Sequence, residues 1–183
     1  MSKKKKAKKK IPEEKNSRIP QIPKPSVEKG SEKTISFLFA YPDWLKSYKN
    51  GNFTTFLKDE SMYGEHMTYL FSQLIPRVSA DWKNNSSSTE FKHCHKIDSS
   101  SDAFKKYKNA IKQIHTRIDL DNLEIWQLGF KGNPMRLICH NGTQSNCLIP
   151  LLVDQHHLGY ESQKHNQKDY KKYKFCPIEK YKK

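Results

Sequence analysis

The sequence predicts an α+β fold in which two helices pack on one face of a small antiparallel sheet. Three observations predict this class: two stretches with helical spacing of apolar residues, three short apolar runs near the C-terminus, and a lysine-rich first segment without a hydrophobic pattern. A chain of 183 residues is long enough for one domain. We expect that domain at 34–162, between a disordered arm (1–33) and a basic Tyr/Lys-rich extension (163–183).

The arm has a composition that opposes folding. Residues 1–33 carry eleven Lys, one Arg and four Glu, with almost no large apolar side chain. Burial therefore cannot offset the conformational entropy of ordering them. A solvated tail, a nuclear localisation signal and an arm that raises non-specific RNA affinity are all open interpretations.

The first elements of the domain are a strand and a helix. The aromatic-rich run from Ile35 to Tyr41, closed by Pro42, predicts a buried first strand, and a loop with Asn50, Gly51 and Asn52 follows. A helix is predicted from Gly64 to Ser79, because its apolar residues lie on one face: Met67, Leu70, Phe71, Leu74, Ile75 and Val78. We expect Pro76 to terminate or kink this helix.

A second amphipathic helix follows the N-cap candidates Ser99 to Asp102. Its apolar face contains Phe104, Tyr107, Ile111, Ile114 and Ile118. Its basic face, together with Lys131 from a later turn, supplies the predicted nucleic-acid-binding residues: Lys105, Lys106, Lys108, Lys112 and Arg117. The alternative is a face that is only solvated.

The C-terminal part predicts an antiparallel meander. Its runs are Leu123 to Phe130, Met135 to His140 and Cys147 to Val153, joined by turns with Lys131-Gly132-Asn133-Pro134 and Asn141-Gly142-Thr143. Beyond Tyr160, aromatic residues alternate with lysines. Their mixture is typical either of a segment that binds single strands or of a helix whose rings pack on the sheet: Tyr170, Tyr173, Phe175 and Tyr181.

Charge restricts the class of partner. Thirty-four Lys and Arg face nineteen Asp and Glu, a net charge of +15, which favours polyanions, and RNA or the ribosome are the expected partners. The sequence has neither an apolar run of about 20 residues nor an apolar segment behind its first lysines, so we expect no membrane contact and a cytoplasmic protein. An interaction protein whose charge serves only a protein partner is the third class.

Metal and cofactor chemistry lack their usual signals. Zinc accepts the ligand types of His93, Cys94, His95, Cys139, His140 and Cys147, but no Cys-x-x-Cys pair occurs. Cys94 and Cys139 are expected to be buried, reduced thiols. Phosphate-loop, dinucleotide and Gly-x-Ser-x-Gly motifs are absent, so we expect no metal and no cofactor.

One cluster on the meander has catalytic residue types. If the strands pair as predicted, five side chains approach one edge of the sheet: Arg136, His140, His156, His157 and Tyr160. Arginine neutralises phosphate and histidine transfers protons near neutral pH, which suffices for RNA cleavage by the 2′-hydroxyl without metal. The alternative is a set of surface histidines with a solvated arginine.

These residues carry a resemblance to a known family. The segments are Trp126 to Leu128, Met135 to Ile138, and Leu148 to Val153 followed by His156, His157 and Tyr160. They resemble the strand-rich C-terminal half of RelE/YoeB-like toxins. Across the wider chain, three further segments are similar to uncharacterised bacterial proteins of an enlarged form of that fold: Tyr69 to Trp82, His93 to Ile97 and Asp154 to Tyr160.

The resemblance implies a metal-independent endoribonuclease toxin that cleaves mRNA, in many cases at the ribosome, and is held by an antitoxin protein. By that resemblance, Arg136 would stabilise the transition-state phosphate, and His157 with Tyr160 would transfer protons and stack on substrate. Glu124 is the candidate for the acidic catalytic residue. The alternative function is a non-catalytic basic RNA- or ribosome-binding protein of the same fold.

Overall fold

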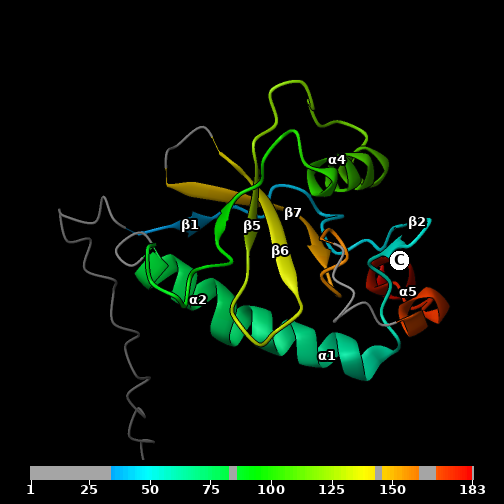
Figure 1. Cartoon of the computed structure of the whole chain (residues 1–183). Coiled ribbons are helices and arrows are strands. Elements are labelled where there is room, and N and C mark those ends of the chain that lie inside the picture. Colours follow the sequence, from blue (N-terminus) through cyan, green and yellow to red (C-terminus); the bar gives the residue numbers. More distant parts are fainter. Residues whose placement is uncertain (1–33, 83–85, 143–145, 161–167, 183) are drawn as a thin grey trace, which may run out of the picture.

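The computed structural model describes residues 34–82, 86–142, 146–160 and 168–182. The predicted arm (1–33) and the first part of the predicted extension (163–167) lie outside these ranges. The protein has a mixed α+β fold, built on a five-stranded sheet of order β1-β7-β6-β5-β4 and a separate two-stranded sheet (Figure 1).

The centre of the large sheet is the antiparallel meander that the sequence predicts. It comprises β5 (Ile125–Leu128), β6 (Arg136–Asn141) and β7 (Cys147–Asp154). The register places Leu128 opposite Leu137 and Arg136 opposite Asp154. β4 (His95–Lys96) pairs with β5 at one edge of this sheet.

The other edge corrects the prediction for the first strand. β1 (Ser36–Phe37) has only two residues and runs parallel to β7 at the margin of the sheet, so a buried strand from Ile35 to Tyr41 is wrong. Leu38 and Phe39 are 52% and 43% exposed. The aromatic character serves side-chain packing instead, because the Phe39 ring lies 5.2 Å from the Trp44 ring.

The first helical segment is longer than predicted. It begins with α1 (Glu60–Tyr69) and η1 (Leu70–Leu74), and continues through α2 (Ile75–Arg77) and η2 (Val78–Trp82). Pro76 does not end it. The Ile75 N–H donates to the Leu70 carbonyl five residues back, and this wider π turn directly precedes the proline, whose ring would crowd an ordinary α turn.

The second predicted helix is α4 (Asp102–Ile114). Its N-cap lies within the predicted stretch, since the Ser101 hydroxyl accepts a hydrogen bond from the Phe104 N–H. Its buried side chains are those of the predicted apolar face, Tyr107, Ile111 and Ile114, together with two alanines.

The two helices cover opposite faces of the sheet (Figure 1), so their predicted placement on one face is wrong. In β6, Leu137 and Cys139 belong to the core beneath the long helix, whereas Ile138 belongs to the core beneath α4. Alternate residues of a strand point to opposite faces, and the strands of this sheet are apolar on both. A helix on each side is the arrangement that buries both faces.

Two smaller pieces complete the fold. β2 (Lys49–Asn50) and β3 (Phe53–Thr54) form a hairpin, and Phe53 packs into the core beneath α4. The C-terminal segment contains η3 (Lys168–Lys172) and α5 (Pro177–Tyr181). It lies against the body of the protein through a bridge between Leu57 and Phe175, and the Tyr170 ring is buried, which favours packing over strand binding for that residue. Within the described ranges, no helix has the length and apolar character needed to cross a bilayer.

Candidate nucleic-acid interface

The loop that follows β7 is organised by one buried carboxylate. Asp154 Oδ1 accepts hydrogen bonds from the backbone N–H groups of His156 (3.2 Å) and Leu158 (3.0 Å). Its Oδ2 accepts from the Tyr107 hydroxyl (2.9 Å) and the Gly159 N–H (2.8 Å). Residues 154–160, which we call the β7 loop, therefore begin with a fold around this side chain.

The approach of α4 to the β7 loop requires a glycine. A Cβ atom built at Gly159 would overlap the phenol of Tyr107, so any larger residue would push the helix and the loop apart. Burial, followed by the charge of Asp154, raises the pKa of Tyr107 well above its usual value. The phenol thus remains a hydrogen-bond donor to the carboxylate at physiological pH.

Arg136 lies inside the protein, opposite Asp154 in the register of β6 and β7. Only 4% of it is exposed. Its guanidinium donates to the carbonyls of Met135 (2.8 Å) and Asn133, and its aliphatic stem crosses Gly129, where a Cβ would come within 2.6 Å of Cδ. Burial lowers the pKa of Arg136, and the nearby charge of Asp154 opposes that effect. In this position the side chain holds the turn between β5 and β6, and its charge lies near the carboxylate of Asp154.

The partly exposed groups of the loop are His157 and Tyr160. The His157 backbone has a φ of 58°, the one left-handed non-glycine residue in the described ranges. Its ring centroid lies 5.8 Å from that of Tyr160 and 6.5 Å from that of His93. Burial, and then the charge of Arg136, lower the pKa of His93. The structure therefore places the predicted His157 beside Tyr160 and adds His93, whose ring lies within the electrostatic reach of Arg136.

His156 has a different environment from its neighbour. Its ring stacks on Tyr170 with a centroid separation of 3.9 Å, and Nε2 lies 2.8 Å from the Phe56 carbonyl, to which it donates. Burial lowers the pKa of His156, and the Phe56 bond opposes the shift. His156 thus anchors the C-terminal segment to the β7 loop.

Two predicted residues lie at the other end of the sheet. His140 is opposite Ile125, and its ring contacts Tyr41, with a centroid separation of 6.0 Å. Glu124 directly precedes β5 at this same end and forms an exposed ion pair with Lys96. The prediction that His140 shares an edge with Arg136 is wrong, because the two residues occupy opposite ends of one strand.

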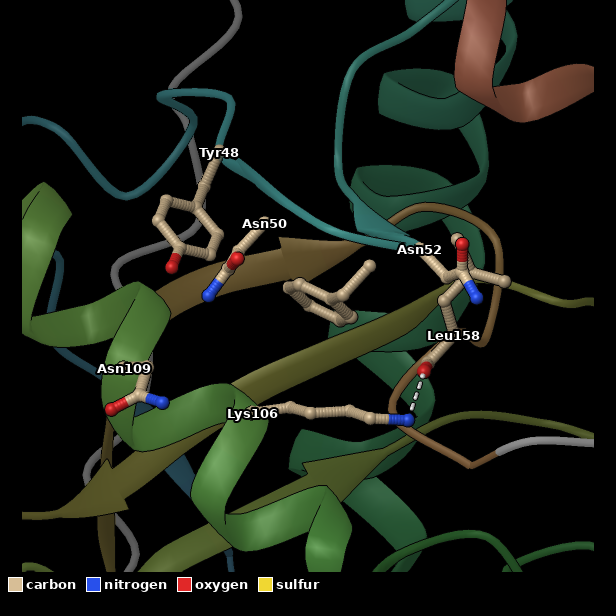
Figure 2. Close-up of a pocket in the computed structure, with 7 residues that line it drawn as sticks. Tyr48, Asn50, Asn52, Lys106, Asn109 and Leu158 are labelled. Atoms are coloured by element: carbon tan, nitrogen blue, oxygen red, sulfur yellow. Dashed lines mark hydrogen bonds between the residues drawn. The ribbon is translucent and has the colours of Figure 1, made fainter.

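The predicted basic side chains divide by location. Lys105 and Lys112 of α4 are exposed, Lys108 is half-buried, and Lys105 pairs with Asp102 at 3.1 Å. Arg117, beyond the end of α4, and Lys131, in the turn before β6, are also exposed. Lys106 is half-buried and extends toward the β7 loop, with Nζ 3.5 Å from the Leu158 carbonyl (Figure 2).

Two cavities flank Lys106. The first, of about 260 Å³, lies between the hairpin and α4, and Figure 2 shows the side chains around it: Tyr48, Asn50, Asn52, Lys106, Asn109 and Leu158. The second, of about 390 Å³, lies along the start of α4 beside Gly159 and Tyr160, and it shares Lys106 and Asn109 with the first. The hairpin also approaches the C-terminal segment, because Lys49 Nζ donates to the Lys171 carbonyl at 2.7 Å.

The sequence contained a signal for this region that the prediction of a loop missed. Asn50-Gly51-Asn52 stands between an aromatic-lysine pair and Phe53, which is typical of a two-residue hairpin turn. Gly51 has the left-handed φ, 58°, that such a turn uses. Sequence spacing alone does not say that this turn faces α4.

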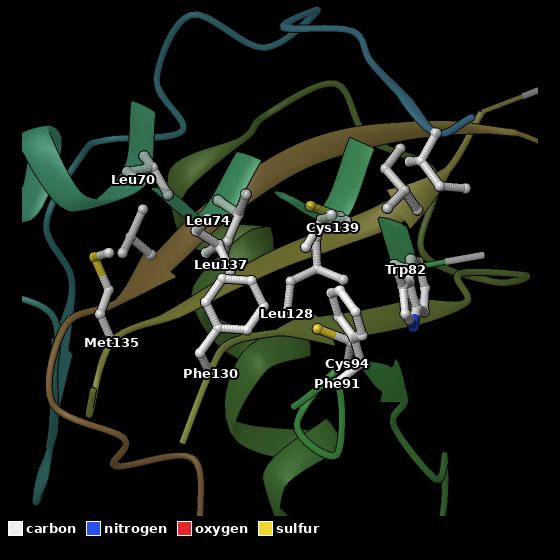
Figure 3. Packing of buried hydrophobic residues seen from close by; sticks show 14 of the residues in the cluster. Leu70, Leu74, Trp82, Phe91, Cys94, Leu128, Phe130, Met135, Leu137 and Cys139 are labelled. Atoms are coloured by element: carbon white, nitrogen blue, oxygen red, sulfur yellow. The ribbon is translucent and has the colours of Figure 1, made fainter. Parts of the chain in front are cut away.

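The cysteines belong to the core beneath the long helix. Figure 3 shows Cys94 and Cys139 among Leu74, Leu128 and Leu137. Burial raises the pKa of Cys94 to about 11 and raises that of Cys139 well above its usual value. Metal binding needs thiolates, and such burial keeps thiols protonated. In the part of the chain that the structure describes, no group of three or more His, Cys, Asp and Glu is arranged to hold a metal ion.

Comparison with known proteins places the chain in a family. The family model described as "Uncharacterised protein UU032" matches residues 40–183. "Uncharacterized protein UU032" of Ureaplasma parvum serovar 3 (strain ATCC 700970) is 41% identical over 146 residues, which cover 78% of this chain and 79% of that protein. No solved structure matches. The chain belongs to the family of the uncharacterised protein UU032.

Proposed function

We propose that this protein binds single-stranded RNA on a surface formed by α4, the β2–β3 hairpin and the β7 loop. We call it the α4 surface. The observation that carries the proposal is the row of lysines on α4 next to two cavities whose walls include polar side chains. Lysines along a groove follow a phosphate backbone, while rings and amides beside it contact bases.

The spacing of the lysines suits an extended backbone. Lys105, Lys108 and Lys112 recur at three and four residues, so they lie along one side of α4. Lys106 borders both cavities on the adjacent side. The net charge of +15 adds long-range attraction for any polyanion, and the row of lysines on α4 is the place where the polyanion binds.

Salt dependence of binding tests this proposal. Affinity for a labelled single-stranded RNA should fall with salt, and each lost phosphate contact should reduce the slope of log K against log salt by about 0.7. The triple variant Lys105→Ala, Lys108→Ala, Lys112→Ala should therefore lower the slope by about 2.

The matched control removes the same charge elsewhere. Lys58, Lys180 and Lys182 form exposed ion pairs with Asp59, Glu60 and Asp43, and their replacement by alanine should cost little stability. If both triple variants lose affinity equally, only the total charge of the protein matters for binding and the α4 surface is not the binding site. Binding that does not respond to salt at all would reject the proposal.

Ribonuclease activity of the RelE/YoeB type is the second candidate, favoured by the pairing of His93 with His157 beside Tyr160. In metal-free cleavage, one imidazole takes the proton of the 2′-hydroxyl as its oxygen attacks phosphorus, and a second protonates the departing 5′-oxygen. The products are a 2′,3′-cyclic phosphate and a 5′-hydroxyl. Arg136, which is buried, would act through its charge rather than by contact.

Cleavage of a long RNA in the presence of EDTA, with and without ribosomes, tests this candidate. His93→Ala and His157→Ala should each abolish cleavage, while His95→Ala, on the neighbouring strand, should retain it. Arg136→Ala is a poor probe, since loss of a buried, hydrogen-bonded guanidinium also destabilises the fold. Intact RNA under every condition would reject the ribonuclease candidate and leave RNA binding as the proposed function.

A further inference from the structure

We propose that the cavity between the β2–β3 hairpin and α4 receives one nucleotide unit of the bound strand, with its base inside and its phosphate at Lys106. This inference rests on the proposed RNA binding and names the subsite that performs it. The cavity is assembled from three segments distant in sequence: the hairpin, α4 and the β7 loop.

The lining chemistry suits a polar heterocycle. Three of its residues, Asn50, Asn52 and Asn109, are carboxamides, which offer both donors and acceptors. Such groups recognise the edges of bases, where donors and acceptors alternate. No carboxylate lines this cavity, so its electrostatics favour a neutral or anionic ligand over a cation.

The aromatic wall provides the second contact that a base requires. The Tyr48 ring is half-buried and lies 6.2 Å from the ring of Phe53, which is buried beneath it. Base stacking on an aromatic side chain tolerates every base, whereas the carboxamides can distinguish them. A volume of about 260 Å³ lies just below the usual range for small-molecule sites, which suits one base rather than a larger ligand.

The position of Lys106 indicates the path of the strand. Its ammonium group extends along the boundary of the hairpin cavity, next to the Leu158 carbonyl (Figure 2), and the second cavity begins on its other side. A phosphate at Lys106 would therefore join a base in the hairpin cavity to the next nucleotide beside Tyr160. The strand would then run along α4, past the exposed lysines.

The test compares matched pairs of variants in the full chain. Asn109→Ala removes a carboxamide of the cavity, and Gln113→Ala removes one from the exposed position a turn later on α4, outside both cavities. Lys106→Ala and Lys112→Ala form the second pair. The probes are labelled oligoribonucleotides of about eight residues and the four free ribonucleoside 5′-monophosphates, and thermal unfolding checks that every variant is folded.

We expect Asn109→Ala to weaken oligonucleotide binding about fivefold, the loss of one hydrogen bond to ligand, with Gln113→Ala unchanged. Lys106→Ala should weaken binding more than Lys112→Ala. Monophosphates that bind wild type but not Asn109→Ala would show that the pocket also takes the free nucleotide. If wild type binds RNA and Asn109→Ala matches Gln113→Ala, the subsite is wrong while RNA binding stands. If wild type binds no RNA, the proposed function itself fails.

Discussion

The phenol of Tyr107 donates a 2.9 Å hydrogen bond to Asp154 Oδ2 across the boundary between α4 and the β7 loop. Both groups are fully buried, and the same carboxylate also holds three backbone N–H groups. This contact fixes the helix that carries the lysine row relative to the loop that carries His157 and Tyr160. The candidate interface therefore depends on a polar contact in the interior.

Tyr107→Phe should destabilise the protein by about 1–3 kcal/mol, because it removes the donor and leaves a buried carboxylate oxygen with one bond fewer. Urea unfolding monitored by circular dichroism measures this change in free energy. Tyr63→Phe, on a half-buried tyrosine of α1, is the control and should change stability by less than about 0.5 kcal/mol. Equal effects in the two variants would contradict a special role for the Tyr107 hydroxyl.

Two glycines should respond in opposite directions to the same substitution. Gly159→Ala introduces a Cβ into the space of the Tyr107 phenol and should cost about 3 kcal/mol. Gly64→Ala, in the exposed middle of α1 with nothing within 4 Å, should stabilise the protein by about 0.5–1 kcal/mol. Thermal unfolding of the two variants provides the measurement, and a tolerated Gly159→Ala would refute the close approach of α4 to the loop.

Stability should decrease as the pH falls below neutrality. Burial lowers the pKa values of His115 and His156 below 6.5, so the unfolded chain binds protons more readily than the folded protein. The free energy of unfolding is therefore at its full value above pH 6.5. It decreases as the pH falls from there, by up to about 1.4 kcal/mol per pH unit for each histidine.

Urea unfolding between pH 8 and about pH 5 tests this dependence. The double variant His115→Gln, His156→Gln should have a flatter profile than wild type. Each substitution removes a ring donor: His115 donates to the Leu151 carbonyl and His156 to the Phe56 carbonyl. The double variant should therefore also be less stable than wild type at pH 8. Parallel profiles for wild type and variant would show that other groups cause the pH dependence.

The four thiols should separate by reactivity. Cys94, Cys139 and Cys176 are buried, and the pKa of Cys94 is about 11, whereas Cys147 is half-buried in β7. Because a thiol reagent needs an accessible thiolate, Cys147 should react first in the native protein. A colorimetric thiol assay should show one fast phase, lost in Cys147→Ser and kept in Cys139→Ser. Several fast phases would mean that the core opens on the timescale of the assay.

Part of the candidate site was predictable because antiparallel pairing follows from short turns. The start of β6 and the end of β7 meet when consecutive strands pair, which brings Arg136 to the segment with His157 and Tyr160. The same reasoning misplaced His140. Four residues further along a strand is about 13 Å, so Arg136 and His140 cannot share one end of it.

The burial of Arg136 was not predictable from its type. Arginine in a strand with catalytic neighbours suggests an exposed phosphate ligand, whereas here its stem crosses Gly129 and its guanidinium bonds backbone carbonyls. His93 was missed for a related reason. It comes from a turn some sixty residues before the β7 loop in sequence, and only the folded sheet brings its ring to His157.

The sequence by itself determined the basic charge, the amphipathic helix α4 with an N-cap within Ser99 to Asp102, and the antiparallel meander, because local spacing and turn residues encode them. Only the tertiary structure decided which helix covers which face, how Asp154 joins α4 to the β7 loop, and that the hairpin faces Asn109 across a cavity. The folded strands are apolar on both faces, so each face needs a cover, and side-chain volumes in three dimensions select the helix that buries each of them.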